Sequence, residues 1–203
     1  MIDWPANGRD AQLQPGGTKM ERIVRQFAEA LKWIDSSREP HKSFQPGVGP
    51  YGEPQVIKKA VEYLRRTYPI DFEGARTKRE PDVLIPGQWA LELKIVRPFG
   101  DNGKPAEHWS ENLLHPYEGN VSSLGDCLKL LRSGLTERKG IVVLTYEHSP
   151  PQVDLSILIL CFEVLAREIL EINLGSRCSA KLQNLIHPVH QQGIVYGWEV
   201  YAA

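Results

Sequence analysis

Residues 81–96 read PDVLIPGQWALELKIV and contain the clearest strand pattern of the chain. Successive side chains of a strand point to opposite faces of a sheet, so residues two apart share a face. In a strand at 88–96, one face is therefore wholly apolar, whereas the other carries Glu92 and Lys94 between apolar neighbours. Burying both charges is costly unless they are paired or bind a metal. The pattern indicates a candidate site; the alternative is an edge strand with one hydrated face and a simple Glu92–Lys94 pair.

The residues before this strand supply a second carboxylate. Pro86-Gly87 is typical of a tight turn, and a short strand is predicted just before it at 81–85. A hairpin through this turn would bring Asp82 beside Glu92. Two carboxylates with open coordination positions suit Mg²⁺, which keeps several waters and takes few protein ligands. The absence of a Cys/His cluster argues against zinc at this place.

A third carboxylate precedes a predicted helix. Pro54 is tolerated in a first turn, and an apolar stripe at helical spacing follows as far as Leu64, so we predict a helix from Glu53 to about Tyr68. Glu53 begins this stripe and is expected to point toward the sheet. Glu62 lies nine positions later and therefore on the opposite face. The alternative for Glu53 is a first-turn glutamate that the helix dipole favours.

The remaining pattern predicts one α/β domain over 18–203, preceded by an irregular arm at 1–17. A mixed central sheet flanked by helices on both faces suits this order. The other predicted elements are a helix at 19–35 capped by Thr18, a weak strand at 70–77, a long loop at 97–118, a helix at 120–133 with Val121, Leu124, Leu128 and Leu131 on one face, a strand at 140–146, a helix at 154–172, a short helix at 177–187 and a strand at 194–201.

The glutamate before the helix, Pro81-Asp82 and Glu92-Leu93-Lys94 together resemble the PD-(D/E)XK nuclease superfamily. The resemblance covers about residues 53–146 and implies a restriction-endonuclease-like core. It also implies that Asp82 and Glu92 bind Mg²⁺, with the Leu93 carbonyl as a further ligand and Mn²⁺ as an expected substitute. By the same resemblance, Lys94 positions or helps to deprotonate the attacking water, and Glu53 supports the metal through water.

The chain also departs from part of that family. Many exonuclease-type members carry a glutamine and a tyrosine four residues apart in the next helix, but the polar residues of the helix at 120–133 are Ser122, Asp126 and Lys129. An endonuclease of the restriction, repair or mobile-element type is therefore expected. Solvent exposure is the preferred interpretation of Asp126 and Lys129, and contact with the site is the alternative.

Charge gives a local indication of the substrate. The formal net charge is only −1, which does not by itself indicate a nucleic-acid-binding protein. Between Lys58 and Arg79, however, seven basic residues face three acidic ones. We expect DNA as the partner, with RNA less favoured. The residues expected to contact it are Lys58, Arg76, Lys78, Arg79, Arg97 and Lys104.

Other features favour or limit alternative functions. The near-neutral charge and the apolar helix at 154–172 are compatible with a non-catalytic nucleic-acid-binding or assembly protein on the same fold, and this helix could form a homodimer. His187 and His190 lie three residues apart with no evident acidic partner, which predicts a structural role. Three widely spaced cysteines fit neither a disulfide framework nor a zinc pattern. No signal peptide or membrane span is predicted, so a cytoplasmic location is expected.

Overall fold

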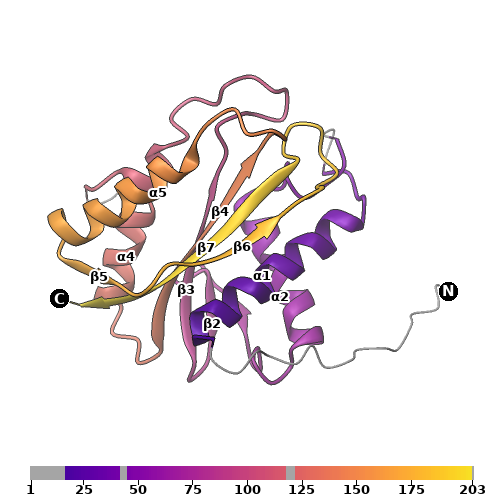
Figure 1. The fold of residues 1–203 in the computed structure, drawn as a ribbon. Coiled ribbons are helices and arrows are strands. Elements are labelled where there is room, and N and C mark those ends of the chain that lie inside the picture. The colour runs from indigo at the N-terminus through magenta and orange to yellow at the C-terminus, as the bar shows by residue number, and fades with distance from the viewer. Residues whose placement is uncertain (1–16, 42–44, 118–121, 203) are drawn as a thin grey trace.

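The computed structural model describes residues 17–41, 45–117 and 122–202; nearly all of the arm predicted at 1–17 lies outside them. Figure 1 shows a mixed sheet with helices on both faces, as the sequence predicts. The sheet has seven strands in the order β1-β2-β3-β4-β7-β5, and β6 also pairs with β7. The strands are β1 (Arg76–Thr77), β2 (Val83–Ile85), β3 (Trp89–Val96), β4 (Arg138–Glu147), β5 (Ile172–Leu174), β6 (Cys178–Leu182) and β7 (Gln192–Ala202).

The helices divide between the two faces of the sheet. α1 and α2 share a core with the apolar face of β3, and the remaining helices share a second core with the opposite face. The two groups lie on opposite sides of the sheet in Figure 1. The helical segments are α1 (Lys19–Ser36), α2 (Glu53–Thr67), α3 (Glu111–Leu114), α4 (Ser123–Arg132), α5 (Leu155–Val164) and the π-helical turn η1 (Leu165–Ile169).

α1 packs directly on β6 and β7 of the sheet. Thr18 caps the helix as predicted, because its hydroxyl accepts a hydrogen bond from the Glu21 N–H at 3.1 Å. A Cβ atom added at Gly197 of β7 would lie 2.4 Å from a Val24 methyl carbon, a separation that real side chains do not adopt. Glycine at this position therefore lets the helix approach the sheet.

The hairpin expected around Pro86-Gly87 is present and fixes the position of Asp82. β2 and β3 pair antiparallel, with Val83 opposite Leu91 and Ile85 opposite Trp89. β2 is only three residues long, so the named strand pairing on this side of β3 stops at Leu91. On its other side, β3 pairs in parallel with β4 along its whole length. The second half of β3 therefore presents an edge that β2 does not cover, and Asp82 lies beside it.

Three sequence predictions outside this region are wrong. The strand expected at 70–77 is mostly turns, with Ile70 at 87% exposure and only Arg76–Thr77 extended. The helix expected at 177–187 is instead β6, which pairs with β7 and buries Cys178 and Leu182. The helix expected at 154–172 ends early, because η1 and a left-handed Glu171 lead into β5.

Packing against the core explains the apolar sequence of α5 only in part. Asp154 caps the helix as predicted and accepts a hydrogen bond from the Ser156 N–H at 3.0 Å. One side of α5 packs into the second core through Leu158, Ile159 and Phe162. The other side leaves large apolar side chains in solvent, namely Ile157, Leu160 and Val164.

None of the described helices combines the length and apolar character that crossing a bilayer requires.

Candidate active site

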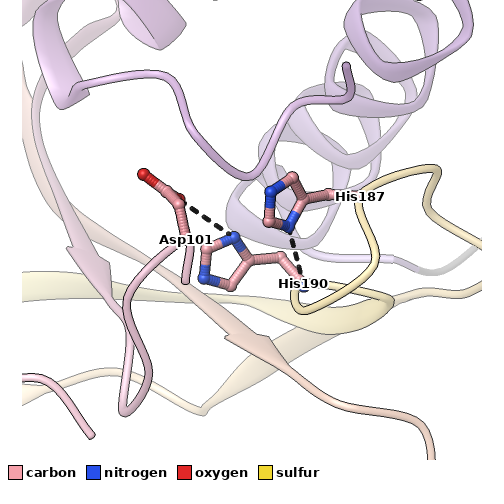
Figure 2. Close-up of side chains that lie close together, drawn as sticks. All are labelled: Asp101, His187 and His190. Atoms are coloured by element: carbon pink, nitrogen blue, oxygen red, sulfur yellow. Dashed lines mark hydrogen bonds and ion pairs between the residues drawn. The ribbon is translucent and has the colours of Figure 1, made fainter. Parts of the chain in front are cut away.

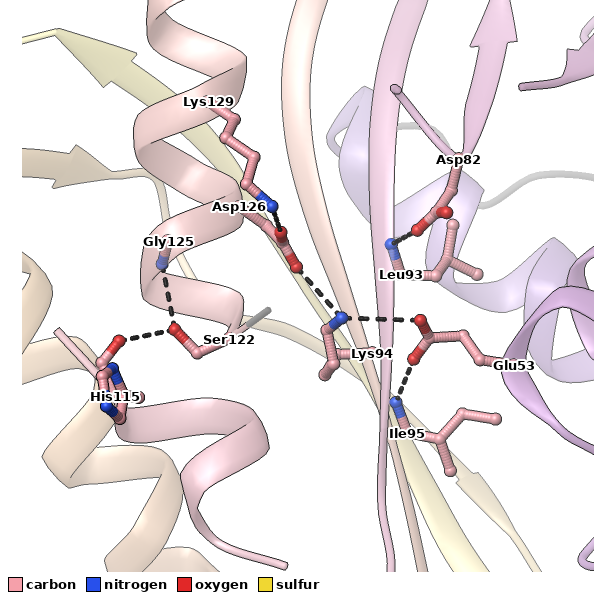
Figure 3. A network of polar contacts seen from close by, with 10 residues as sticks. All are labelled: Glu53, Asp82, Leu93, Lys94, Ile95, His115, Ser122, Gly125, Asp126 and Lys129. Carbon is pink, nitrogen blue, oxygen red and sulfur yellow. Dashed lines mark hydrogen bonds and ion pairs between the residues drawn. The ribbon is translucent and has the colours of Figure 1, made fainter. Parts of the chain in front are cut away.

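Two carboxylates replace the missing neighbour strand along the second half of β3. Asp82 accepts a hydrogen bond from the Leu93 N–H at 2.8 Å, and Glu53 accepts one from the Ile95 N–H at 3.0 Å (Figure 3). The N–H and C=O groups of one strand residue point toward the same neighbour. The Leu93 carbonyl therefore also faces this edge. Helix phase predicted that Glu53 points toward the sheet, and its hydrogen bond with the Ile95 N–H agrees with that prediction.

Lys94 extends from β3 between two acidic side chains, as Figure 3 shows. Its Nζ atom lies 3.4 Å from Glu53 Oε1 and 3.1 Å from Asp126 Oδ2, and the residue is only 7% exposed. Burial opposes the charge on Lys94, but the carboxylates of Glu53 and Asp126 outweigh it and raise the pKa of the ammonium group. In the metal-free protein Lys94 is therefore held as a cation, which can stabilise negative charge.

Glu92 is the most perturbed carboxyl group of the cluster. Burial, the negative charge of Asp82 and a hydrogen bond between the two side chains raise the pKa of Glu92 to about 9. Burial also raises the pKa of Asp82, although the Leu93 N–H opposes this effect. Two carboxyl groups that repel each other in this way retain a proton between them. A divalent cation can replace that proton and bind both groups.

Asp126 is the site residue that the sequence placed incorrectly. It was expected in solvent, but it is 3% exposed and pairs with both Lys94 and Lys129. The phase of the predicted helix explains the error, because Cys127 and Leu130 of α4 are buried, whereas Leu128 is only partly buried. The i, i+4 spacing of Asp126 and Leu130 was the available signal.

The charge of the cluster matches a divalent cation. Its carboxyl groups are Glu53, Asp82, Glu92 and Asp126, and its ammonium groups are Lys94 and Lys129. When all are ionised, four negative and two positive charges leave a net charge of −2. No three of the four carboxyl groups bring oxygens within 4.8 Å of one another. The residues therefore fit a cation held by a pair of carboxylates, a backbone carbonyl and water, which is the usual environment of Mg²⁺.

Pockets open on two sides of this cluster. One has a volume of about 470 Å³ and is lined by Glu53, Lys94, Arg97 and Trp109, among others. The second, of about 430 Å³, is lined by Glu92 and Lys129 together with Pro81. A larger pocket of about 560 Å³ lies between β7, β6 and the start of α5, away from the cluster. Size therefore does not identify the candidate site, whereas the perturbed carboxyl groups do.

The expected nucleic-acid contacts separate into two groups. Arg97 is committed within the protein, because its guanidinium group donates to the Tyr51 carbonyl and lies over the Tyr146 ring. It nevertheless lines the pocket that contains Lys94. The other expected cations are exposed and could reach a phosphate backbone: Lys58, Arg76, Lys78, Arg79 and Lys104.

A second polar cluster lies in the loops beyond the carboxyl ends of β3 and β4. His187 and His190 were expected to lack an acidic partner, but Asp101 lies beside them (Figure 2). Ligand atoms of these three residues all lie within 4.8 Å of one another, which makes them a candidate metal site. No local pattern in the sequence indicates Asp101 as their partner, because only folding brings it close to residues far away along the chain.

Comparison of the chain with protein-family models, curated proteins and solved structures finds no match.

Proposed function

We propose that this protein is a metal-dependent nuclease that hydrolyses phosphodiester bonds in DNA, with a restriction-endonuclease-like core over residues 53–146. The observation that carries the proposal is geometric: Asp82 and Glu53 accept the Leu93 and Ile95 N–H groups at the uncovered edge of β3, and Lys94 lies between Glu53 and Asp126. Buried beside Asp82, Glu92 has a pKa raised to about 9. This arrangement is similar to that of the PD-(D/E)XK nucleases. An ordinary surface ion pair would explain neither the burial of Glu92 nor its raised pKa.

The residues have complementary roles in this proposal. Asp82 and Glu92 would bind the metal directly, the Leu93 carbonyl would be a further ligand, and Glu53 would support it through water. Bound Mg²⁺ or Mn²⁺ would lower the pKa of a coordinated water and polarise the scissile phosphate. The charged Lys94 stabilises the negative charge that develops on the phosphate in the transition state. Asp126 and Glu53 hold the Lys94 ammonium group in position from two sides.

DNA is the proposed substrate because exposed cations lie close to the carboxylates along the chain. Arg76 lies in β1, Lys78 and Arg79 follow it just before Asp82, and Lys58 lies in α2, which begins with Glu53. Such residues bind the phosphate backbone without reading its sequence. An endonuclease of restriction, repair or mobile-element type is proposed, because α4 carries Asp126 and Lys129 in place of the glutamine and tyrosine of exonuclease-type members.

A cleavage assay tests this function directly. Plasmid, single-stranded DNA and RNA are incubated with the protein in Mg²⁺, Mn²⁺ or EDTA. We expect cleavage of DNA only with a divalent cation, and a loss of at least about 100-fold in Lys94→Met and Asp82→Asn. Lys32→Met, which removes an exposed lysine of α1, is the matched control and should cleave like the wild type. Metal-dependent cleavage that persists unchanged in Lys94→Met would show that the assignment is wrong.

The alternative function is a non-catalytic nucleic-acid-binding or assembly protein on the same fold. The neutralisation of Lys94 by two carboxylates and the exposed apolar side of α5 favour it. Calorimetry with Mg²⁺ separates the two functions. Binding that disappears in Glu92→Gln supports the nuclease, whereas a protein that neither binds Mg²⁺ nor cleaves DNA supports the alternative.

A further inference from the structure

Asp101, His187 and His190 form a polar cluster that the nuclease proposal does not use. Asp101 lies in the loop after β3, and both histidines lie in the loop before β7 (Figure 2). His187 and His190 are 0% and 1% exposed, and their rings stack with centroids 4.8 Å apart. Three buried atoms of the cluster have no hydrogen-bond partner among the described residues: Asp101 Oδ1, His187 Nε2 and His190 Nδ1.

The hydrogen bonds of His190 fix which of its nitrogens carries a lone pair. Nε2 lies 3.0 Å from the Phe99 carbonyl oxygen, which can only accept, so Nε2 must carry the proton. A neutral imidazole carries one proton, and the buried Nδ1 atom has no hydrogen-bond partner among the described residues. Nδ1 therefore presents a free lone pair. This is the usual arrangement of a metal-binding histidine, whose other nitrogen donates to a carbonyl or carboxylate.

Two acceptors consequently face each other. His190 Nδ1 lies 3.6 Å from Asp101 Oδ1, and both atoms are buried without a hydrogen-bond partner among the described residues. A cation between them removes this repulsion. With metal–ligand distances of about 2.0–2.2 Å, a tetrahedral ion separates two of its ligands by about 3.4 Å, close to the observed spacing.

We propose that His190 Nδ1 and Asp101 Oδ1 bind a divalent first-row transition metal of the zinc class, at a site separate from the carboxylates of β3. Imidazole and carboxylate together suit Zn²⁺, Cu²⁺ and Ni²⁺, whereas Mg²⁺ prefers oxygen ligands alone. The charged groups around the site are Asp101, Asp35 and Arg97, whose net charge of −1 favours a cation. Waters complete the coordination shell.

His187 has a supporting role rather than a ligand role. Its Nδ1 accepts hydrogen bonds from the N–H groups of Val189 and His190, both at 3.2 Å, so its proton lies on Nε2. That N–H can donate to the Asp101 carboxylate or to a metal-bound water. Gly49 leaves room for the His190 ring, because a Cβ atom there would lie 2.4 Å from Nδ1. The loop at 45–50 thus packs tightly against the proposed ligand.

The proposed metal would join two loops that approach the candidate active site. Asp101 lines the same pocket as Glu53 and Lys94, whereas His190 lies two residues before the start of β7. A metal held by both residues would fix the wall of this pocket. The proposal does not depend on nuclease activity, because binding at this site involves neither Asp82 nor Glu92.

Zinc binding by tag-free protein tests the proposal. Equilibrium dialysis with Zn²⁺ and the absorption spectrum with Co²⁺ are recorded in an Asp82→Asn/Glu92→Gln background, which removes the proposed magnesium ligands. We expect one equivalent of Zn²⁺ and an imidazole-dependent Co²⁺ spectrum in this background. Adding Asp101→Asn or His190→Gln should weaken binding at least about 10-fold.

A matched control and a second measurement keep the result interpretable. Asn102→Asp adds a carboxylate next to Asp101 in the same loop and should leave the stoichiometry at one. The melting temperature should rise with Zn²⁺ in the background protein but not after Asp101→Asn, which nearly preserves side-chain shape. Absence of Zn²⁺ binding in the background protein, or binding that Asp101→Asn and His190→Gln leave unchanged, would overturn the proposal.

Discussion

Lys94 owes its position to Asp126 on one side and Glu53 on the other, and the two acids differ in what else they do. Glu53 also accepts the Ile95 N–H, which anchors it to β3. Asp126 instead forms ion pairs through both oxygens, Oδ1 with Lys129 and Oδ2 with Lys94. Its buried Oδ2 atom has no further hydrogen-bond partner among the described residues. Asp126 is therefore the residue whose main contribution is electrostatic.

Asp126→Asn should lower nuclease activity about 10-fold while keeping the fold. The carboxylate raises the pKa of Lys94, so its removal lowers that pKa, and the alkaline limit of activity should move to lower pH. The measurement is kcat as a function of pH. Lys129→Met is the control, because it removes the other partner of Asp126 and should not move this limit downward. An unchanged pH profile in Asp126→Asn would contradict the positioning role.

Glu92 should make the metal-free protein less stable as pH rises. Its pKa is about 9 in the folded state and near 4.5 when unfolded, so the folded state binds the extra proton between these values. The resulting stabilisation is full below about pH 4.5 and is lost through pH 9, at up to about 1.4 kcal/mol per pH unit.

Urea unfolding of the wild type and Glu92→Gln between pH 5.5 and 8.5, in EDTA, measures this effect. The amide cannot ionise, so the variant should gain stability over the wild type as pH rises. Added Mg²⁺ should reduce the difference, because it stabilises only the protein that binds it. Parallel pH dependences of the two proteins would show that Glu92 is already ionised.

The sequence predicted Glu92 and Lys94 because a period of two is a local property of a strand. The predictions for Glu53 and Asp82 each required one further inference. Glu53 required the phase of a helix, and Asp82 required the pairing of a hairpin. The prediction for Asp126 failed because α4 has apolar residues on more than one side. Which side faces inward is therefore decided by packing against the sheet. The partnership of Asp101 with His190 has no local pattern, since it exists only after two distant loops meet.

At the level of elements, strands that carry their own hydrophobic pattern were predicted well. β3, β4 and β7 are buried on both faces and read as strands in isolation. β5 and β6 are short, and both pair with the same outer edge of β7, at its end and its beginning respectively. Their extended form comes from that pairing, which the local sequence does not encode.

The contact between α1 and β7 predicts a large effect of a small substitution. Gly197→Ala places a methyl group 2.4 Å from the Val24 side chain, so α1 or the sheet must shift. We expect a loss of about 1–3 kcal/mol in the free energy of unfolding, measured by urea denaturation. Gly175→Ala is the matched control, because its nearest neighbour lies at 3.4 Å and its backbone is not left-handed. Equal stabilities of the two variants would contradict the close approach.

At the level of the whole molecule, the outer side of α5 favours a homodimer, which we propose as the assembly in solution. Ile157, Leu160 and Val164 are 63%, 55% and 45% exposed on a helix whose opposite side is in the core. Light scattering at micromolar concentration should give twice the monomer mass. Leu160→Asp should reduce it to that of a monomer, whereas Gln183→Asp, an exposed control outside α5, should not. A monomeric wild type would exclude this dimer.

The short length of β2 has a consequence for solubility. An uncovered strand edge is a template on which other chains can add strands and aggregate. Asp82 and Glu53 accept hydrogen bonds from the Leu93 and Ile95 N–H groups, which no neighbouring strand among the described residues pairs with. The same side chains therefore block the addition of a further strand at this edge. Both acids would serve this purpose even in a related protein without the proposed nuclease activity. Among such relatives, retention of Glu92 and Lys94 would therefore support the proposed activity, whereas retention of Asp82 and Glu53 would not.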